Sequence, residues 1–117
     1  MNEVLVNGVR AKVARTMLER MRGLIGTRDL GPGEGMLIEK CNCIHTFFMS
    51  FPIDAAFLDS SDRVVKVVKG IKPWRPFVWG GFRARKVIET KHIPAAAGPA
   101  PLQLSTNDCV HIGGFVE

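Results

Sequence analysis

Cysteine and histidine side chains gather in the middle of the chain, where Cys41, Cys43 and His45 alternate with other residues. Thiolate and imidazole groups are ligands that suit zinc or copper. Residues two apart in a strand share a face, but they are separated by roughly 6.5–7 Å, whereas a zinc–sulfur bond is about 2.3 Å. The spacing therefore favours small apolar residues that line a core or pocket, and we expect no cofactor. A metal ion held by these three residues is the alternative.

Polar side chains follow in the same apolar stretch at His45, Thr46 and Asp54. Imidazole, hydroxyl and carboxylate groups could transfer a proton or clamp a polar ligand. No nucleophile motif such as Gly-x-Ser-x-Gly accompanies them, and an aspartate near a turn commonly accepts backbone N–H groups. These residues favour binding over catalysis, while a hydrolase-like enzyme that uses Cys41, Cys43, His45 and Asp54 is kept as an alternative.

Positive charge is concentrated in one part of the chain. The net charge is +5, and residues 63–92 hold nine Lys or Arg with Glu89 as the only acidic residue. Four aromatic side chains lie inside this stretch: Trp74, Phe77, Trp79 and Phe82. Cations beside aromatic rings are typical of surfaces that bind single-stranded nucleic acid, and they also suit an anionic partner, a small anionic ligand or a membrane surface. Alternatively, the aromatic rings cover one end of the fold and the cations form a solvated face.

Glycine and proline divide the chain into short apolar segments, with 12 Gly and 7 Pro in all. Asn7-Gly8 between two valine-rich runs predicts a hairpin over residues 3–13. Further strands are predicted at 36–38, 41–49, 53–58, 63–69, 85–90, 102–105 and 109–113, with a turn at 59–62 and an irregular linker at 70–81. One short helix is predicted near residues 14–22. Residues 1–117 are therefore predicted to form a single all-β domain, a β-sandwich or partly open barrel of about eight short strands.

Composition excludes several classes of protein. The chain is 46% hydrophobic and 23% charged, which is typical of a folded globular protein. No apolar run approaches the roughly 20 residues of a membrane-spanning helix, so we expect no membrane span. Three cysteines cannot form a complete set of internal disulfides, which favours a reducing compartment. We expect a cytoplasmic protein as the chain stands, with an already removed leader as the alternative.

The central run has a distinctive order of residues. It reads CIHTFFMSFPID at residues 43–54 and FLD at 57–59, and it is accompanied by RGL at 22–24, GML at 35–37 and PWR at 73–75. With these segments the chain resembles, from about residue 15 to its end, the bacterial and archaeal family called domain of unknown function 192. Glu89 and Asp108 match acidic positions of that family. The resemblance implies a small β fold and no established biochemistry.

The combined prediction is a non-catalytic binding or accessory module. Its expected site is a shallow one for a small molecule or a protein partner, because apolar walls with a few convergent polar groups suit binding. Six residues are predicted to contribute: His45, Thr46, Met49, Asp54, Trp74 and Arg75. One alternative is the metalloprotein or hydrolase-like enzyme described above. The second is binding of nucleic acid or an anionic surface through residues 63–92.

Overall fold

The computed structural model describes residues 2–14, 34–46, 49–94 and 103–116 of the chain. All the regular secondary structure in these residues is β-strand, so the prediction of an all-β fold is confirmed. The strands are β1 (Asn2–Val6), β2 (Val9–Ala14), β3 (Glu34–Glu39), β4 (Cys43–Ile44), β5 (Ile53–Leu58), β6 (Val64–Ile71), β7 (Val78–Trp79), β8 (Lys86–Lys91) and β9 (Ile112–Val116).

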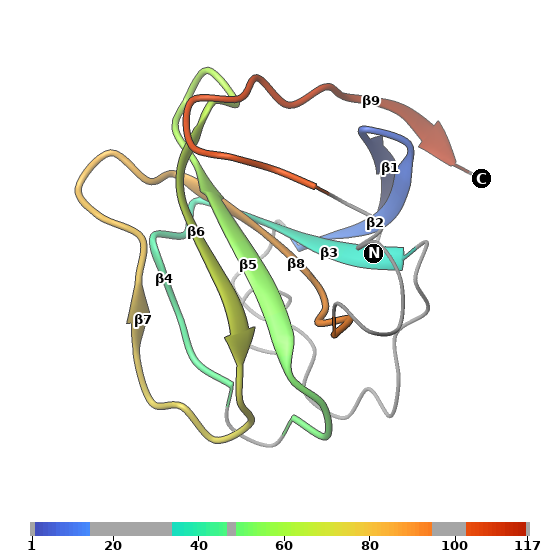
Figure 1. The fold of residues 1–117 in the computed structure, drawn as a ribbon. Coiled ribbons are helices and arrows are strands. Elements are labelled where there is room, and N and C mark those ends of the chain that lie inside the picture. Colours follow the sequence, from blue (N-terminus) through green and yellow to red (C-terminus); the bar gives the residue numbers. More distant parts are fainter. Residues whose placement is uncertain (1, 15–33, 47–48, 95–102, 117) are drawn as a thin grey trace.

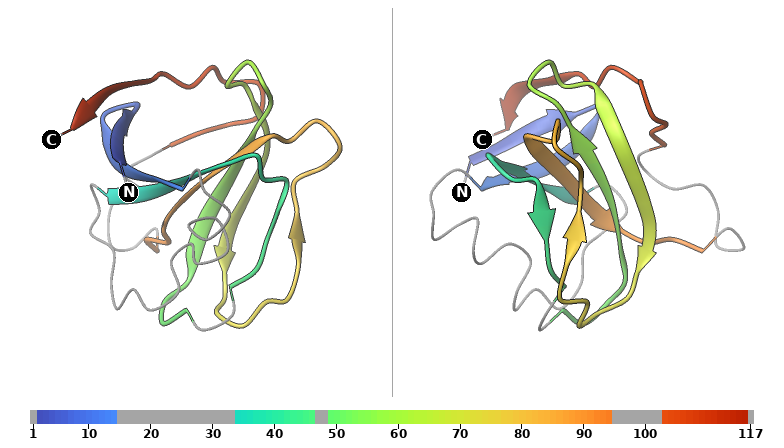
Figure 2. Two further views of the ribbon diagram at one scale, coloured as in Figure 1. Left: turned by 180° about the vertical axis from the view of Figure 1, so that it is seen from behind. Right: turned by 90° about the vertical axis from the view of Figure 1, so that its left-hand side faces the viewer.

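Seven of these strands form one curled sheet in the order β6-β5-β8-β3-β2-β1-β9. Neighbouring strands are antiparallel except β2 and β3, which are parallel. The sheet curls into an open half-barrel, so the partly open barrel is the better of the two predicted architectures (Figure 1). The remaining strands, β4 and β7, form a small antiparallel sheet beside β5 and β6 (Figure 2).

The predicted N-terminal hairpin is confirmed. Asn7 has a φ of 47° and Gly8 a φ of 84°, and a type I′ turn needs both of these left-handed conformations. Val6 pairs with Val9 across the turn, and both side chains are buried. A short sequence signal therefore sets both the turn and the register of this hairpin.

The two faces of the large sheet carry separate cores, because side chains alternate along each strand. On β5, Phe57 belongs to the first core and Leu58 to the second. The first core lies on the side of the small sheet, and it includes Ile44 of β4 and Val78 of β7. The second core lies on the opposite face, where side chains of β1 and β2 cluster with Leu104. The small sheet is thus attached to the large one through the first core.

Over the described residues of the strand predicted at 41–49, only β4 is confirmed. Lys40 has a left-handed φ of 53°, so the chain turns after β3. The amide of Cys41 then donates a hydrogen bond to the carbonyl of Arg85 at 2.9 Å. Among the described residues of this range, only the two of β4 pair with another strand. That strand, β7, lies in the linker 70–81, which is predicted to be irregular.

The C-terminal part of the chain also differs from the sequence pattern, which predicts strands at 102–105 and 109–113. No strand is present in the described residues of 102–105, and at the start of 109–113 Cys109 makes only an isolated bridge with Arg63. Asn107, with a left-handed φ of 76°, turns the chain between the two ranges. The true last strand is β9, which begins near the end of the second range.

The other predicted strands overlap β3, β5, β6 and β8, and the predicted turn between β5 and β6 is present. The helix predicted near 14–22 falls outside the described residues, apart from Ala14, which ends β2. No helix in the described part of the chain is long and apolar enough to cross a membrane.

Candidate functional site

Thr46 joins the segment after β4 to the loop before β7. Its side chain is fully buried, and Oγ1 donates to the carbonyl of Lys72 and accepts the amide of Arg75, each at 2.7 Å. Its own amide donates to the carbonyl of Arg75 at 2.9 Å, and its carbonyl accepts the amide of Trp74 at 2.8 Å. Four hydrogen bonds to one buried residue therefore fix the loop that carries Trp74 and Arg75.

These contacts bring several of the predicted site residues together. His45 precedes Thr46 and is exposed, as are Trp74 and Arg75. The amide of Met49 donates to the carbonyl of Thr46 at 3.3 Å, but the Met49 side chain is buried in the first core. Trp74 has a left-handed φ of 69°, which costs energy for a bulky residue and persists only where surrounding contacts impose it. The loop is thus held in one conformation.

Asp54, the sixth predicted residue, faces away from this group. It lies opposite Thr90 on the β5–β8 ladder, while its neighbours along β5 point into the first core. Asp54 Oδ1 accepts the amide of Gly70 at 2.8 Å and lies 2.8 Å from Nδ1 of His92. The sequence gives no local signal for the Asp54–His92 pair, because only the register of β5 with β8 places them side by side.

Exposed aromatic side chains lie on β7 and in the loops at its two ends. The exposed fractions are 58% for Trp74, 61% for Phe77, 37% for Trp79 and 84% for Phe82. Leu5 is the only other large hydrophobic side chain exposed among the described residues. The rings of Trp79 and Phe82 contact each other edge to face, with centroids 4.7 Å apart and an interplanar angle of 87°. Apart from Leu5, all the large apolar side chains exposed among the described residues therefore lie in this region.

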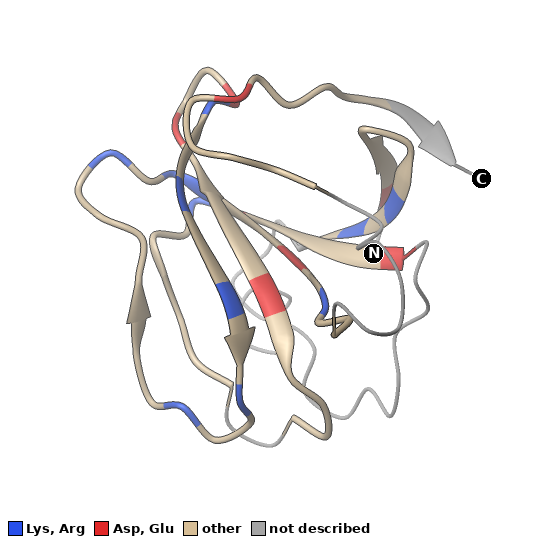
Figure 3. Ribbon diagram, in the orientation of Figure 1, with Lys and Arg blue, Asp and Glu red and all other residues tan. Residues whose placement is uncertain are grey.

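Positive charges flank these rings. Lys and Arg residues lie in the loops at both ends of β7 (Figure 3). Lys66 lies on β6, and its Nζ donates to the carbonyl of Trp79 at 2.8 Å. We define the aromatic–basic surface as Lys72, Trp74, Arg75, Phe77, Trp79, Phe82 and Arg83, all of which are exposed.

The thiols of the metal-binding alternative make local contacts. Cys41 Sγ donates to the carbonyl of Cys43 at 3.1 Å, and Cys43 Sγ lies 3.9 Å from the carbonyl of Ile44. Both side chains are half-buried, whereas His45 is exposed. Over the ranges that the structure describes, no three His, Cys, Asp or Glu side chains are grouped so that they could hold a metal ion.

Glu89 is a buried carboxyl group in the middle of β8. It pairs with Met36 on β3 and Ala55 on β5, which places it on the face of the first core and not with Asp54. Only 3% of Glu89 is exposed, and burial raises the pKa of its carboxyl from 4.5 to about 8. The carboxyl is therefore mainly neutral at pH 7, so the only acid of residues 63–92 contributes little negative charge near the aromatic–basic surface.

The chain matches the model of the family called domain of unknown function 192 (DUF192), described as uncharacterized ACR, over residues 2–98. The chain belongs to DUF192. It is 41% identical over 88 residues to a UPF0127 protein of Thermococcus sibiricus, covering 69% of this chain and 54% of that protein. It is 52% identical over 46 residues to a UPF0127 protein of Pyrococcus horikoshii, covering 39% of this chain and 38% of that protein. The matched region thus spans about half, or less, of these curated relatives.

Two solved structures resemble the DUF192 chain in fold. A protein of unknown function from Novosphingobium aromaticivorans superposes with a TM-score of 0.72 and 21% identity, covering 94% of this chain and 82% of its own. A Sinorhizobium meliloti protein, proposed to be a transcription regulator, superposes with a TM-score of 0.75 and 16% identity, covering 95% and 91%. At these identities the likeness extends to the fold alone.

Two of the segments that carry the DUF192 resemblance meet in space. The run at 43–54 contributes Thr46, and the segment at 73–75 contributes Trp74 and Arg75, which are hydrogen-bonded to it. Residue types identify both segments, but only the structure shows that one fixes the other.

Proposed function

We propose that this DUF192 chain is a non-catalytic binding module whose aromatic–basic surface docks an acidic segment of a protein partner. The observation that carries the proposal is the exposure of four aromatic side chains beside cations on and around β7. Clustered exposed apolar side chains mark interaction sites, and buried Trp, Phe and Arg side chains supply much of the energy of protein interfaces.

The positive charge of the surface favours a negatively charged partner. Lys72, Arg75 and Arg83 attract carboxylates, and Glu89 offers little competing charge because it is mainly protonated at neutral pH. Opposite charges around an interface raise the rate of association and exclude partners of the wrong sign. An acidic segment with apolar side chains therefore complements both features of the surface.

Rigidity supports binding as well. The hydrogen bonds of Thr46 already hold the loop that carries Trp74 and Arg75, so little conformational entropy is lost when a partner docks. Asp54, one of the groups that a hydrolase-like reaction would use, is bonded instead to the amide of Gly70 and to His92.

The ring geometry favours a protein partner over single-stranded nucleic acid. Nucleic acid-binding surfaces offer open ring faces on which bases stack. Trp79 and Phe82 instead contact each other edge to face, so the edge of one ring covers a face of the other. This paired apolar surface suits contact with apolar side chains of a protein.

Intrinsic tryptophan fluorescence tests this function, because both tryptophans of the chain belong to the aromatic–basic surface. The probes are a short synthetic peptide rich in Glu and Leu, its version with Gln in place of Glu, and an oligothymidylate. We expect the acidic peptide to shift the emission and the neutral peptide to bind much more weakly. Phe82→Ala should weaken binding of the acidic peptide by about tenfold.

The matched control is Leu5→Ala, which removes an exposed apolar side chain on β1 and should leave binding unchanged. Equal binding of the acidic and neutral peptides would contradict the proposal. Tighter binding of the oligothymidylate, with a steep loss of affinity as salt rises, would assign the surface to nucleic acid instead.

A further inference from the structure

A cavity of about 610 Å³ opens beside the first residues of β8. Three segments supply its wall: Lys40, Cys41 and Asn42 after β3, Ser60 in the β5–β6 turn, and Arg85 and Lys86 at β8. This volume is within the range of small-molecule sites, about 300–1,000 Å³. No residue of the aromatic–basic surface lines it, so it is a separate site.

Main-chain hydrogen bonds fix the wall. The amide of Cys41 donates to the carbonyl of Arg85 at 2.9 Å, and the amide of Arg85 donates to the carbonyl of Leu58 at 2.7 Å. The carbonyl of Asn42 accepts the amide of Gly80 at 2.7 Å. These bonds tie the segments after β3 and before β8 to each other and to β5, so the cavity does not depend on side-chain packing alone.

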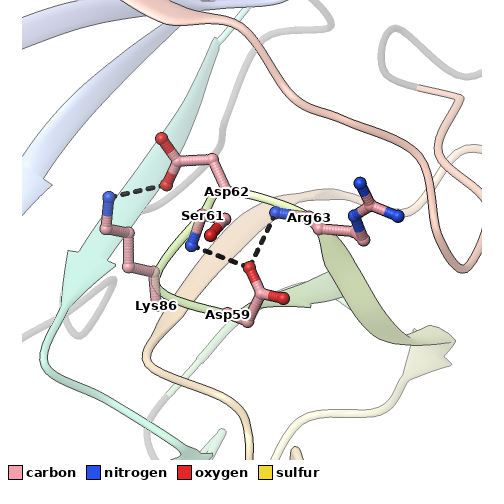
Figure 4. Close-up of polar contacts among 5 residues, drawn as sticks. All are labelled: Asp59, Ser61, Asp62, Arg63 and Lys86. Carbon is pink, nitrogen blue, oxygen red and sulfur yellow. Dashed lines mark hydrogen bonds and ion pairs between the residues drawn. The ribbon is translucent and has the colours of Figure 1, made fainter.

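The β5–β6 turn that carries Ser60 is fixed in the same way (Figure 4). Asp59 Oδ1 accepts the amides of Ser61 at 2.8 Å and Arg63 at 3.1 Å. The hydrogen bonds from Arg63 and Ser61 hold the pKa of Asp59 below its usual value. Asp59 is therefore ionised at neutral pH, and the turn keeps its shape.

The charges around the cavity are predominantly positive. Lys86 Nζ forms an ion pair with Asp62 at 2.6 Å, so these two charges balance (Figure 4). Glu39, which also lines the cavity, is half-buried and engaged in an interaction of its own. Arg85 and Lys40 have no ion pair with another residue of the described part of the chain. The cavity therefore has an excess of cations available to a ligand.

Arg85 is oriented before any ligand arrives. Its Nη1 donates to the carbonyls of Phe82 at 2.8 Å and Ala84 at 2.9 Å. Within the described residues these are the acceptors of its side chain, which leaves the Nε and Nη2 donors for another group. A guanidinium with two free donors in a fixed plane matches a carboxylate or phosphate.

We propose that this cavity binds a small molecule through a carboxylate or phosphate group, which Arg85 and Lys40 hold. Asn42 and Ser60 supply hydrogen-bonding groups for the remainder of the ligand. Cys41 also lines the cavity, so a bound ligand is expected to restrict access to its thiol. The inference does not depend on the function proposed for the aromatic–basic surface.

Thiol labelling tests the site in the full chain. The protein is treated with iodoacetamide in the presence of inorganic phosphate or succinate, and labelling of each cysteine is followed by tandem mass spectrometry. At least one anion should slow labelling of Cys41 while leaving the exposed Cys109, which does not line the cavity, unchanged. The effective anion identifies the group as phosphate or carboxylate.

Charge variants identify the residues that hold the anion. Lys40→Gln should raise the anion concentration for half-protection of Cys41 by about tenfold. Lys12→Gln is the matched control, because it removes the same charge from an exposed position on β2 and should change nothing. Arg85→Gln should abolish protection, and Lys40→Gln keeps the test decisive if that variant fails to fold.

Three outcomes would overturn the proposal. The first is that neither anion protects Cys41, and the second is that sodium chloride of equal ionic strength protects it equally. The third is that Lys40→Gln and Lys12→Gln give the same protection of Cys41. The tryptophan emission reports separately on the aromatic–basic surface, so failure of one site is distinguishable from failure of the other.

Discussion

The large sheet and the small sheet use aromatic side chains in opposite ways. Phe57 of β5 is fully buried in the first core, whereas Phe82, beside β7, is 84% exposed. Burying such a side chain contributes about 1.5–3 kcal/mol, so the large sheet gains stability that the small sheet forgoes. The small sheet buries Ile44 and Val78 and displays the rings around them. The contrast suggests that the large sheet supports the fold and the small sheet serves recognition.

The two regions meet at Gly80. A Cβ atom there would overlap the Phe57 ring, so the chain approaches the first core closely only because this residue has no side chain. The same residue donates its amide to the carbonyl of Asn42 at 2.7 Å. One close contact thus joins the buried aromatic ring of the large sheet to the strand that displays the exposed rings.

Truncation of the buried Phe57 ring is the strongest test of this difference between the two sheets. Phe57→Ala should lower the free energy of unfolding by about 3–5 kcal/mol, because it leaves a cavity under both sheets. Phe82→Ala removes the same atoms from the surface and should change stability by no more than about 0.5 kcal/mol. Urea unfolding followed by circular dichroism measures both. Similar losses in the two variants would show that the exposed ring also stabilises the fold.

The pH dependence of stability tests the large sheet at Glu89. Below its unfolded value of 4.5 the carboxyl is neutral in both states. Between 4.5 and about 8 the unfolded chain releases the proton that the folded chain keeps, so stability falls as pH rises. The expected loss from this group across that range is on the order of 4 kcal/mol.

Glu89→Gln removes this titration and should flatten the pH dependence of the free energy of unfolding. Phe82→Ala, which removes no titratable group and changes an exposed side chain, is the control and should keep the slope of the natural chain. Urea midpoints at several pH values provide the measurement. If Glu89→Gln retains the slope, another group is responsible and the carboxyl is not held neutral by burial.

Local signals explain what the sequence could predict of the fold. Asn7-Gly8 determines a turn by its own backbone preferences, and alternation around it determines which valines are buried. Residues 41–49 alternate as convincingly, yet the strand stops at Ile44 because Thr46 bonds to the loop at 72–75. A contact between segments so far apart in sequence overrides the local pattern, and no local rule contains it.

The candidate site residues also divide into those that the sequence could predict and those that it could not. Residue type alone pointed to Thr46, Trp74 and Arg75, and the structure brings them together. The pairing of Asp54 with His92 needs the register of β5 and β8. The grouping of Lys40 with Arg85 around a cavity needs the left-handed turn after β3. Positions fixed by register or by an unusual φ could not be read from composition and spacing.

The smallest of these effects concerns the loop that displays Trp74. Thr46→Val keeps the size of the side chain but removes Oγ1, which leaves the Lys72 carbonyl and the Arg75 amide without their partner. We expect a loss of about 2 kcal/mol in the free energy of unfolding, since buried polar groups left without a partner are costly. Thr46→Ser keeps the hydroxyl and should retain most of the stability of the natural chain.

Tryptophan emission distinguishes a local effect from a global one. The Val variant should shift the emission before unfolding begins, because the loop loosens while the large sheet stays intact. Equal behaviour of the Val and Ser variants would mean that packing, and not hydrogen bonding through Oγ1, holds the displayed rings in place.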